Sequence, residues 1–535
     1  MSLISALQRH PSAWWALAMA LVAGLVLAGM VTALLSLAPL VWTAILLCAL
    51  LALIPALILR DPLRYWLAMF LLASMVDIKK TLLDGLAVMD KLDLVAITPT
   101  SQLVLEIRLS DLVLVVLLLH WAVQLATRRT QFRLPRVSLL VLGLMLWSAV
   151  SSTLALHPYL GFVEMSNQLR YFVVFLYAVN NFRDTRRLAL VGCVLLAMLT
   201  VQSGLTGARY VFGFGEFLSG GALGRTQAID TTEHLNVERG GGGRRAFGTV
   251  VTPAGTAAHL LLLLPWPMLL LLHSRKRWLR LLAGGMFAAG TVTLLMTYSR
   301  SAFLGFVLSC ALGIALAIRW RYVTRQGVFV LLLVVLLGSV AAAPAVIGFI
   351  NKRPDNIQVR MAQFKTAGAM LLDNFVLGVG PNNSAATQRR YAKEASSSAA
   401  ATDPTQKSDI HPIHSQHLAN LVELGIGGAA LYYGFFFVIL RHAARLTHAE
   451  DPLTRIVGAG YLIGTPGLFV QLLTDPMLEY SVLVLLWFLS GLVEGLHGRP
   501  RSMPPGDARP SAAAQFKVSD WLGLRADSST IQATQ

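Results

Sequence analysis

Charged side chains are scarce in this chain of 535 residues, of which only 13% are Asp, Glu, Lys or Arg. Soluble globular domains carry about 25% charged residues, so this scarcity excludes a soluble enzyme. Cysteine is also rare, and Cys48, Cys193 and Cys310 lie far apart within apolar runs. Such scattered cysteines exclude a disulfide framework and a cysteine-based metal site. Hydrophobic residues make up 56% of the chain instead, which indicates a membrane protein.

The hydrophobic residues form runs that approach or exceed the ~20 residues needed to cross a bilayer as a helix. We therefore expect an all-α polytopic membrane protein with about 14 transmembrane helices. The expected spans are residues 13–35, 38–59, 63–77, 109–126, 137–156, 168–181, 188–206, 250–273, 281–298, 301–318, 327–350, 418–440, 456–474 and 480–497. The third and sixth are short enough to be re-entrant or interfacial. No small-residue cleavage site follows the first apolar run, so we expect a retained helix there.

Acidic residues are too few to balance the basic ones, since 27 Asp and Glu face 44 Lys and Arg, a net charge of +17. In a multi-span protein this excess is typical of cytoplasmic loops rather than of nucleic-acid binding. If both termini are cytoplasmic, every short inner loop is basic and the short outer turns are nearly bare. The inner-loop residues include Arg60, Arg64, Arg128, Arg129, Arg133, Arg136, Arg183, Arg186, Arg187, Arg275, Lys276, Arg277, Arg280, Arg319, Arg321, Arg325, Arg441, Arg445 and Arg455.

This topology divides the chain into six parts. They are N-terminal transmembrane helices over 1–206, an outer loop rich in Gly and Arg over 207–249, helices over 250–350, a long outer loop over 351–417, C-terminal helices over 418–497 and a disordered cytoplasmic tail over 498–535. The outer segment 78–108 is close to neutral, and the sequence indicates no function for it.

Three arginines on the outer side of this topology are candidates for binding an anion. Arg245 follows a run of four glycines, and such a run lets backbone amides and arginine forks approach an anion. Arg300 lies in the turn between two apolar helices, where an arginine is costly unless it meets an anionic partner or reaches the interface. Arg360 lies in an expected interfacial helix over about 357–373, before the turn Gly378-Val379-Gly380-Pro381. Contact with lipid headgroups is the alternative for Arg245 and Arg360, and snorkelling to the interface is the alternative for Arg300.

The long outer loop closes with three histidines, His411, His414 and His417. A metal site is one interpretation, but Pro412 interrupts the helix that would align the three side chains. A single histidine acting as proton acceptor is favoured, because the ordinary pKa of imidazole lies nearest to working pH. A histidine that only hydrogen-bonds the headgroup region is the remaining alternative.

Arg245, Arg300, Arg360 and His414 are distant in sequence, yet the topology puts all four on one side of the membrane. This arrangement indicates a shared anionic ligand such as a lipid-linked phosphate or pyrophosphate. Arginines around a pyrophosphate would stabilise it as a leaving group without a metal ion or other cofactor. A nearby histidine would then take the proton from an attacking hydroxyl.

These motifs resemble the O-antigen ligase superfamily, which includes O-antigen ligases and O-antigen and exopolysaccharide polymerases. The resemblance covers about 245–440 and rests on four segments: Arg245 to Pro253, Tyr298 to Ser301, Arg360 to Pro381, and His414 to Gly425. Three features depart from the common pattern, namely Ser415 after the loop histidine, Asn382 and Asn383 after the Gly-Val-Gly-Pro turn, and the long polar stretch 384–410.

The resemblance implies a GT-C-like fold in a bacterial inner membrane, with a large periplasmic loop between spans 11 and 12. It implies metal-independent, inverting transfer of a glycan from undecaprenyl pyrophosphate to an acceptor hydroxyl. By the same resemblance, Arg300, Arg360 and Arg245 bind the pyrophosphate, and His414 and Arg360 are the catalytic residues. We favour polymerisation of lipid-linked repeats, because the long N-terminal half and enlarged loop look like exopolysaccharide systems.

Two other functions stay open. An O-antigen ligase would transfer the finished glycan to lipid A-core. A transporter or flippase of lipid-linked glycan would place ionisable groups near the membrane midplane. Glu423 is the best candidate for such a group, and it lies near the outer end of its expected helix.

Overall fold

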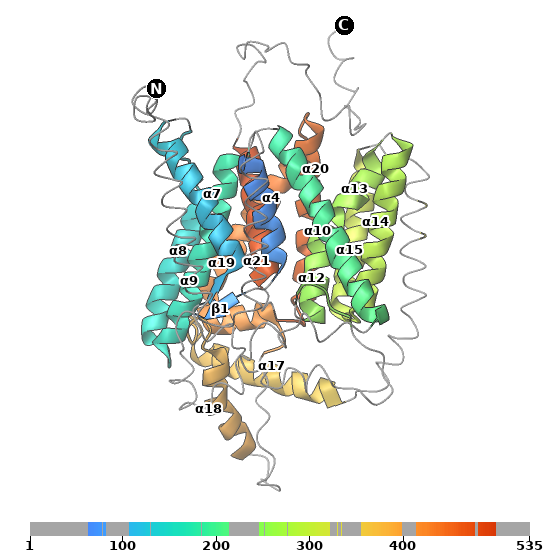
Figure 1. Cartoon of the computed structure of the whole chain (residues 1–535). Coiled ribbons are helices and arrows are strands. Elements are labelled where there is room, and N and C mark those ends of the chain that lie inside the picture. Colours follow the sequence, from blue (N-terminus) through green and yellow to red (C-terminus); the bar gives the residue numbers. More distant parts are fainter. Residues whose placement is uncertain are drawn as a thin grey trace, which may run out of the picture.

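The chain folds into a bundle of long helices in the computed structural model (Figure 1). The structure describes residues 62–76, 79–81, 106–128, 130–182, 185–212, 246–250, 252–274, 276–320, 329, 333, 355–397, 413–476 and 480–498. The elements are α4 (Pro62–Met75), β1 (Lys79–Thr81), β2 (Glu106–Arg108), α7 (Leu109–Ala126), α8 (Ser138–Leu154), α9 (Pro158–Asn181), α10 (Thr185–Phe212), α12 (Pro253–Leu263), α13 (Pro265–His273), α14 (Arg277–Met296), α15 (Arg300–Arg319), α17 (Asp355–Asp373), α18 (Ser384–Ser397), α19 (Gln416–Leu446), α20 (Pro452–Gln471) and α21 (Tyr480–His497).

Eight helices of the described ranges are long and apolar enough to cross a membrane, and the fold is that of a polytopic membrane protein. Two shorter apolar helices, Leu63–Met75 and Ser138–Leu154, accompany them. The expected spans 13–35 and 38–59, and nearly all of 327–350, lie outside the described residues. The expected sixth span, 168–181, is the second half of α9, which begins ten residues earlier at Pro158.

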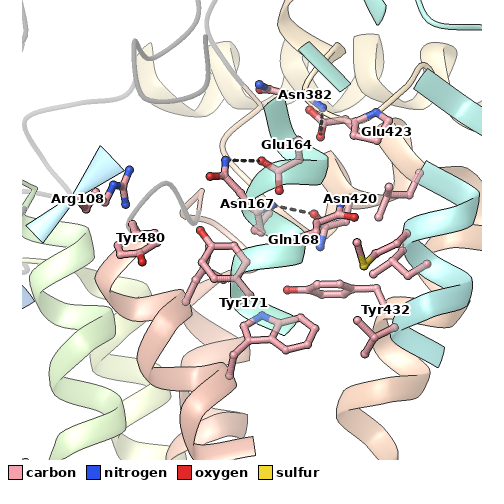
Figure 2. A pocket seen from close by; sticks show the side chains of 18 residues that line it. Arg108, Glu164, Asn167, Gln168, Tyr171, Asn382, Asn420, Glu423, Tyr432 and Tyr480 are labelled. Carbon is pink, nitrogen blue, oxygen red and sulfur yellow. Dashed lines mark hydrogen bonds between the residues drawn. The ribbon is translucent and has the colours of Figure 1, made fainter. Parts of the chain in front are cut away.

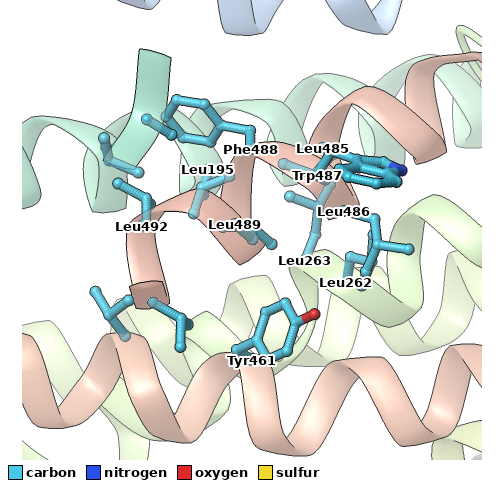
Figure 3. Close-up of a cluster of buried hydrophobic side chains, with 14 of the residues drawn as sticks. Leu195, Leu262, Leu263, Tyr461, Leu485, Leu486, Trp487, Phe488, Leu489 and Leu492 are labelled. Atoms are coloured by element: carbon cyan, nitrogen blue, oxygen red, sulfur yellow. The ribbon is translucent and has the colours of Figure 1, made fainter. Parts of the chain in front are cut away.

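Helices α12, α13 and α21 form the centre of the bundle. The segment Pro253–His273, which comprises α12 and α13, is almost entirely buried, and so is α21. Figure 3 shows side chains of α21 packed against Leu195 of α10, Leu262 and Leu263 of α12, and Tyr461 of α20. These helices are apolar on every side, which is the pattern of a helix enclosed by other helices.

Helices α17 and α18 lie outside the bundle at one of its ends, where α17 runs across the long helices (Figure 1). The helix predicted over 357–373 is present as α17. Its buried residues Ala367 and Met370 form an apolar cluster with Ile413 and Val422, which lie just before and within α19. This cluster fixes the long loop against the end of the bundle.

Helix α19 is interrupted at Gly425, which has φ 62° and ψ −174°. The chain segment 375–380 runs alongside this break and supplies the hydrogen bonds that the helix loses. The amide of Ile426 donates to the carbonyl of Phe375 (2.9 Å), and the amides of Val379 and Gly380 donate to the carbonyls of Val422 (2.9 Å) and Glu423 (3.1 Å). Non-helical backbone at membrane depth is tolerated where protein satisfies its polar groups.

Replacing Gly425 with Ala should prevent the loop from reaching α19. A Cβ atom there would collide with the carbonyl group of Val376, and the positive φ disfavours any residue with a Cβ. We expect Gly425→Ala to lower the free energy of unfolding by about 2 kcal/mol or more. Thermal unfolding of the purified protein in detergent measures this change.

Gly434→Ala is the matched control, because Gly434 lies in the same helix and a Cβ there meets nothing within 4 Å. Equal melting temperatures for the two variants would contradict the structural role given to Gly425.

Candidate functional site

The segment that follows α20 binds the N-terminal ends of α15 and α19 at the end of the bundle where α17 lies. The Asp475 carboxylate, just beyond α20, accepts hydrogen bonds from the hydroxyls of Ser299 (3.1 Å) and Ser301 (2.7 Å) at the start of α15. The amide of Gln416, the first residue of α19, donates to the carbonyl of Leu472 (3.0 Å). The segment Leu472–Asp475 therefore holds the N-terminal ends of α15 and α19 on one side of the molecule.

Two of the predicted site residues lie at these helix ends. Arg300 is the first residue of α15 and is exposed, between the two serines that bind Asp475. His414 is half-buried and stands between Ile413, which is buried in the cluster with α17, and Ser415. The Ser415 hydroxyl caps α19 by accepting from the Leu418 amide (3.3 Å). Residues close to Arg300 and His414 in the sequence thus bind the same short segment, 472–475.

The structure describes only the backbone of Arg360 and does not describe Arg245. Arg360 lies in α17, but its side chain is outside the described part of the structure. The described second half of α17 packs on the residues next to His414. Arg245 lies outside the described residues, and the chain resumes beside it at Ala246, whose amide donates to the Met296 carbonyl at the end of α14 (2.9 Å).

Both ring nitrogens of His417 are used in hydrogen bonds within the bundle. Its Nε2 atom lies 2.8 Å from the carbonyl oxygen of Phe469, which only accepts, so Nε2 carries the proton. Its Nδ1 atom therefore accepts from the Tyr433 hydroxyl (2.7 Å). Both ring nitrogens are occupied, so His417 is not available as a metal ligand or as a proton acceptor. His411 lies outside the described residues.

Both carboxylate oxygens of Glu423 are likewise used in hydrogen bonds within the protein. One carboxylate oxygen accepts from the Asn382 amide (2.9 Å), and the other accepts from the Ser384 hydroxyl (2.6 Å). Asn382 has φ 60°, so it needs a partner that holds it in this left-handed conformation. Glu423 therefore binds the turn after Gly380 to α19 rather than presenting a free charge to a transport path.

A second connection joins this turn to the N-terminal end of α9. The Asn383 side chain accepts from the His157 amide (2.9 Å) and donates to the His157 carbonyl (3.2 Å). Burial, and then the positive charge of Arg390 on α18, lower the pKa of His157 below its ordinary value. The imidazole of His157 is therefore neutral at neutral pH.

A polar cavity of about 120 Å³ lies behind the turn, among α8, α9, α19 and α21 (Figure 2). Its polar lining comes from Arg108, Glu164, Asn167, Gln168, Asn382, Gln416, Asn420 and Glu423, and its aromatic lining from Tyr171, Tyr432, Tyr480 and Trp487. The side chain of Gln416 donates to that of Asn420 (2.8 Å) across the lining. Because Gln416 follows His414 by two residues, the cavity adjoins the predicted site.

The sequence-based prediction missed this cavity. Glu164 precedes the expected span 168–181, and segment 78–108, which supplies Arg108, had no expected function. A signal was present in the spacing of Glu164, Asn167, Gln168 and Tyr171, which puts polar and aromatic side chains on one face of a helix. A polar helix face next to apolar residues indicates a wall facing a cavity rather than lipid.

Residues 285–433 match the model of the O-antigen ligase family. The match confirms the resemblance to the O-antigen ligase superfamily, and it indicates an enzyme of the glycosyl-transfer type whose partners are a lipid-linked glycan and an acceptor. Arg300, Arg360 and His414 lie within the matched residues, whereas Arg245 lies before them. No curated protein matches the chain.

Replacing Asp475 with Ala should destabilise the start of α15. Two serine hydroxyls would lose a charged acceptor, and such a bond contributes about 1.5–3 kcal/mol where it is buried. Because the Asp475 side chain is only half-buried, we expect a loss of about 1–2 kcal/mol in the free energy of unfolding. Chemical denaturation in detergent measures this loss against Glu450→Ala, which removes an exposed carboxylate elsewhere. Equal stability of the two variants would remove the role given to Asp475.

Proposed function

We propose that this protein is a glycosyltransferase that moves a glycan from undecaprenyl pyrophosphate to an acceptor hydroxyl at the periplasmic face, in polymerisation of O-antigen or exopolysaccharide. One observation carries the proposal: the neighbours of Arg300 and of His414 in the sequence both bind the segment Leu472–Asp475 at one end of the bundle. Arg300 and His414 themselves lie within the region that matches the O-antigen ligase family. A cationic group and a proton acceptor at one helix-bundle end suit transfer from a pyrophosphate.

In this proposal Arg300 and Arg360 bind the pyrophosphate, and Arg245 assists from the preceding loop. The bond between the anomeric carbon and the pyrophosphate oxygen breaks, and a bond forms from the acceptor oxygen to the opposite face of that carbon. His414 takes the acceptor proton, and undecaprenyl pyrophosphate leaves with the electron pair. The arginines stabilise the charge that develops on the leaving oxygen, so no metal ion is required.

The orientation follows from charge at the two bundle ends. Helix α7 begins at the cavity with Arg108, so its other end and the start of α8 lie at the opposite end of the bundle. The described basic residues between them are Arg128, Arg133 and Arg136, and the ends of α14, α15, α19 and α20 add Arg277, Arg280, Arg319, Arg441, Arg445 and Arg455. Basic short loops face the cytoplasm, which supports a periplasmic active site in the bacterial inner membrane.

Alanine substitution of Arg360 or His414 should each lower product formation by 100-fold or more. A general base contributes about 10²–10⁴-fold, and one donor to a developing anion contributes about 10²–10³-fold. The measurement is glycosidic bond formation by purified protein given a lipid-linked oligosaccharide. Arg441→Ala, at the opposite bundle end, is the control and should keep normal activity. Full activity of both site variants would contradict the mechanism.

The same assay separates an enzyme from a transporter or flippase. Formation of a glycosidic bond without ATP supports the enzyme, whereas translocation of the lipid-linked glycan without product supports the carrier. The two hydrogen bonds on Glu423 favour the enzyme, because they occupy the group that a carrier would most readily use.

Deletion of the gene should distinguish a polymerase from an O-antigen ligase that transfers glycan to lipid A-core. We expect single repeats on undecaprenyl pyrophosphate to accumulate in the deletion strain, and mass spectrometry of extracted lipids would identify them. Accumulation of full-length chains on the same lipid would identify a ligase instead.

A further inference from the structure

The cavity behind the Gly378–Pro381 turn offers few cationic groups to a pyrophosphate. The charged side chains of its lining are two carboxylates, Glu164 and Glu423, and one guanidinium, Arg108. Arg108 is itself bonded to Glu106 (2.9 Å) and lies 3.9 Å from the ring centre of Tyr480. The guanidinium in the lining is thus already engaged, so a pyrophosphate would meet no available cation among the described residues of this cavity, whereas an uncharged ligand needs none.

The polar groups of the cavity suit a ligand rich in hydroxyls. A hydroxyl both donates and accepts, so it needs carboxylate acceptors and amides that do both. Glu164 accepts one long hydrogen bond, from Asn167 (3.3 Å), although a carboxylate offers about four acceptor positions. The side-chain oxygen of Gln168 is buried without a hydrogen-bond partner among the described residues. A buried polar atom of this kind calls for a ligand or water to satisfy it.

The size and aromatic wall of the cavity suit one six-membered ring. Its volume of about 120 Å³ is close to the ~150 Å³ of an apolar cavity that accepts a benzene molecule. The rings of Tyr171 and Trp487 are stacked on its wall, 6.4 Å apart and inclined by 17°. Figure 2 shows Tyr171 and Tyr432 on the side away from Glu164 and Asn382. A sugar ring has C–H faces for such a wall and hydroxyls at its edge for the polar side.

We propose that this cavity is a subsite for one uncharged sugar ring of the glycan substrate, with Glu164 and Gln168 as its hydrogen-bonding residues. The inference rests on the proposed glycan transfer, which it deepens by separating the two parts of the substrate. In this proposal the pyrophosphate lies among the arginines, and a sugar ring lies in the polar cavity next to Gln416. The ring belongs either to the lipid-linked donor or to the acceptor glycan, and both have the same chemistry.

Direct binding tests the subsite without catalysis. The full chain in lipid nanodiscs is titrated with the methyl glycosides of glucose, galactose, mannose, rhamnose and N-acetylglucosamine, and saturation-transfer NMR measures binding. We expect at least one glycoside to bind saturably and Glu164→Gln to weaken it about tenfold, the effect of losing one charge-assisted hydrogen bond. Glu450→Gln, which changes an exposed carboxylate, should leave binding unchanged. Absence of saturable binding, or equal binding by both variants, overturns the inference.

Kinetics then test the subsite within the reaction. We expect Glu164→Gln and Gln168→Ala to raise the KM of one substrate about tenfold and to leave kcat within about twofold. A raised KM for the lipid-linked donor assigns the ring to the donor, and a raised KM for the acceptor assigns it to the acceptor. A lowered kcat with unchanged KM overturns the inference, because it would make these residues part of the chemistry or of folding.

These measurements distinguish a failure of the proposed function from a failure of the sugar subsite. If the wild-type protein forms no glycosidic bond, the proposed function fails, whatever the glycosides do. If the wild-type protein is active and both variants have the KM values of Glu450→Gln, only the sugar subsite fails. Unchanged melting temperatures of the variants show that a raised KM does not come from unfolding.

Discussion

The attachment of the outer loop to a broken helix is the constraint on which the rest of the site depends. Gly425 interrupts α19, and segment 375–380 fills the interruption with three backbone hydrogen bonds. Because unsatisfied backbone groups are costly when buried, the loop and the broken helix stabilise each other. Glu423 adds two bonds to the turn that follows. The break therefore converts a long loop into a fixed wall of the cavity and a fixed support for α17.

Much of the bundle follows from composition, whereas the contacts that build the site do not. Long apolar runs predict helices such as α14, α15 and α20, since each needs only a continuous hydrophobic sequence. The break in α19 could not be predicted from hydrophobic runs, because Gly425 lies among residues of good helical pattern. The backbone that it lies against, at Val376, is about fifty residues away in the sequence. A backbone hydrogen bond between distant segments leaves no periodic pattern to detect.

The residues of the candidate site also divide into those that the sequence could predict and those that it could not. Arg300 could be predicted because a lone arginine between two apolar helices is conspicuous, and His414 because it closes a polar loop. Asp475 could not be predicted, because an acidic residue in a short turn indicates no role until its two serine partners are known. Glu164 was missed because polar residues lower the hydropathy of a span, so a window method starts the helix after them, although α9 begins at Pro158.

The separation of the arginine from the polar cavity at this end of the bundle favours the proposed glycan substrate over a simple anion. Arg300 lies at the start of α15, whereas the carboxylates Glu164 and Glu423 line the neighbouring cavity. The position of His414 is set by Ile413 in the apolar cluster, by the Ser415 cap and by the bond from Gln416 to Leu472. In the proposed reaction, a substrate with a charged and an uncharged part would contact both regions at once. Backbone contacts at the start of α19 hold His414, the proposed proton acceptor, close to the segment that binds the start of α15.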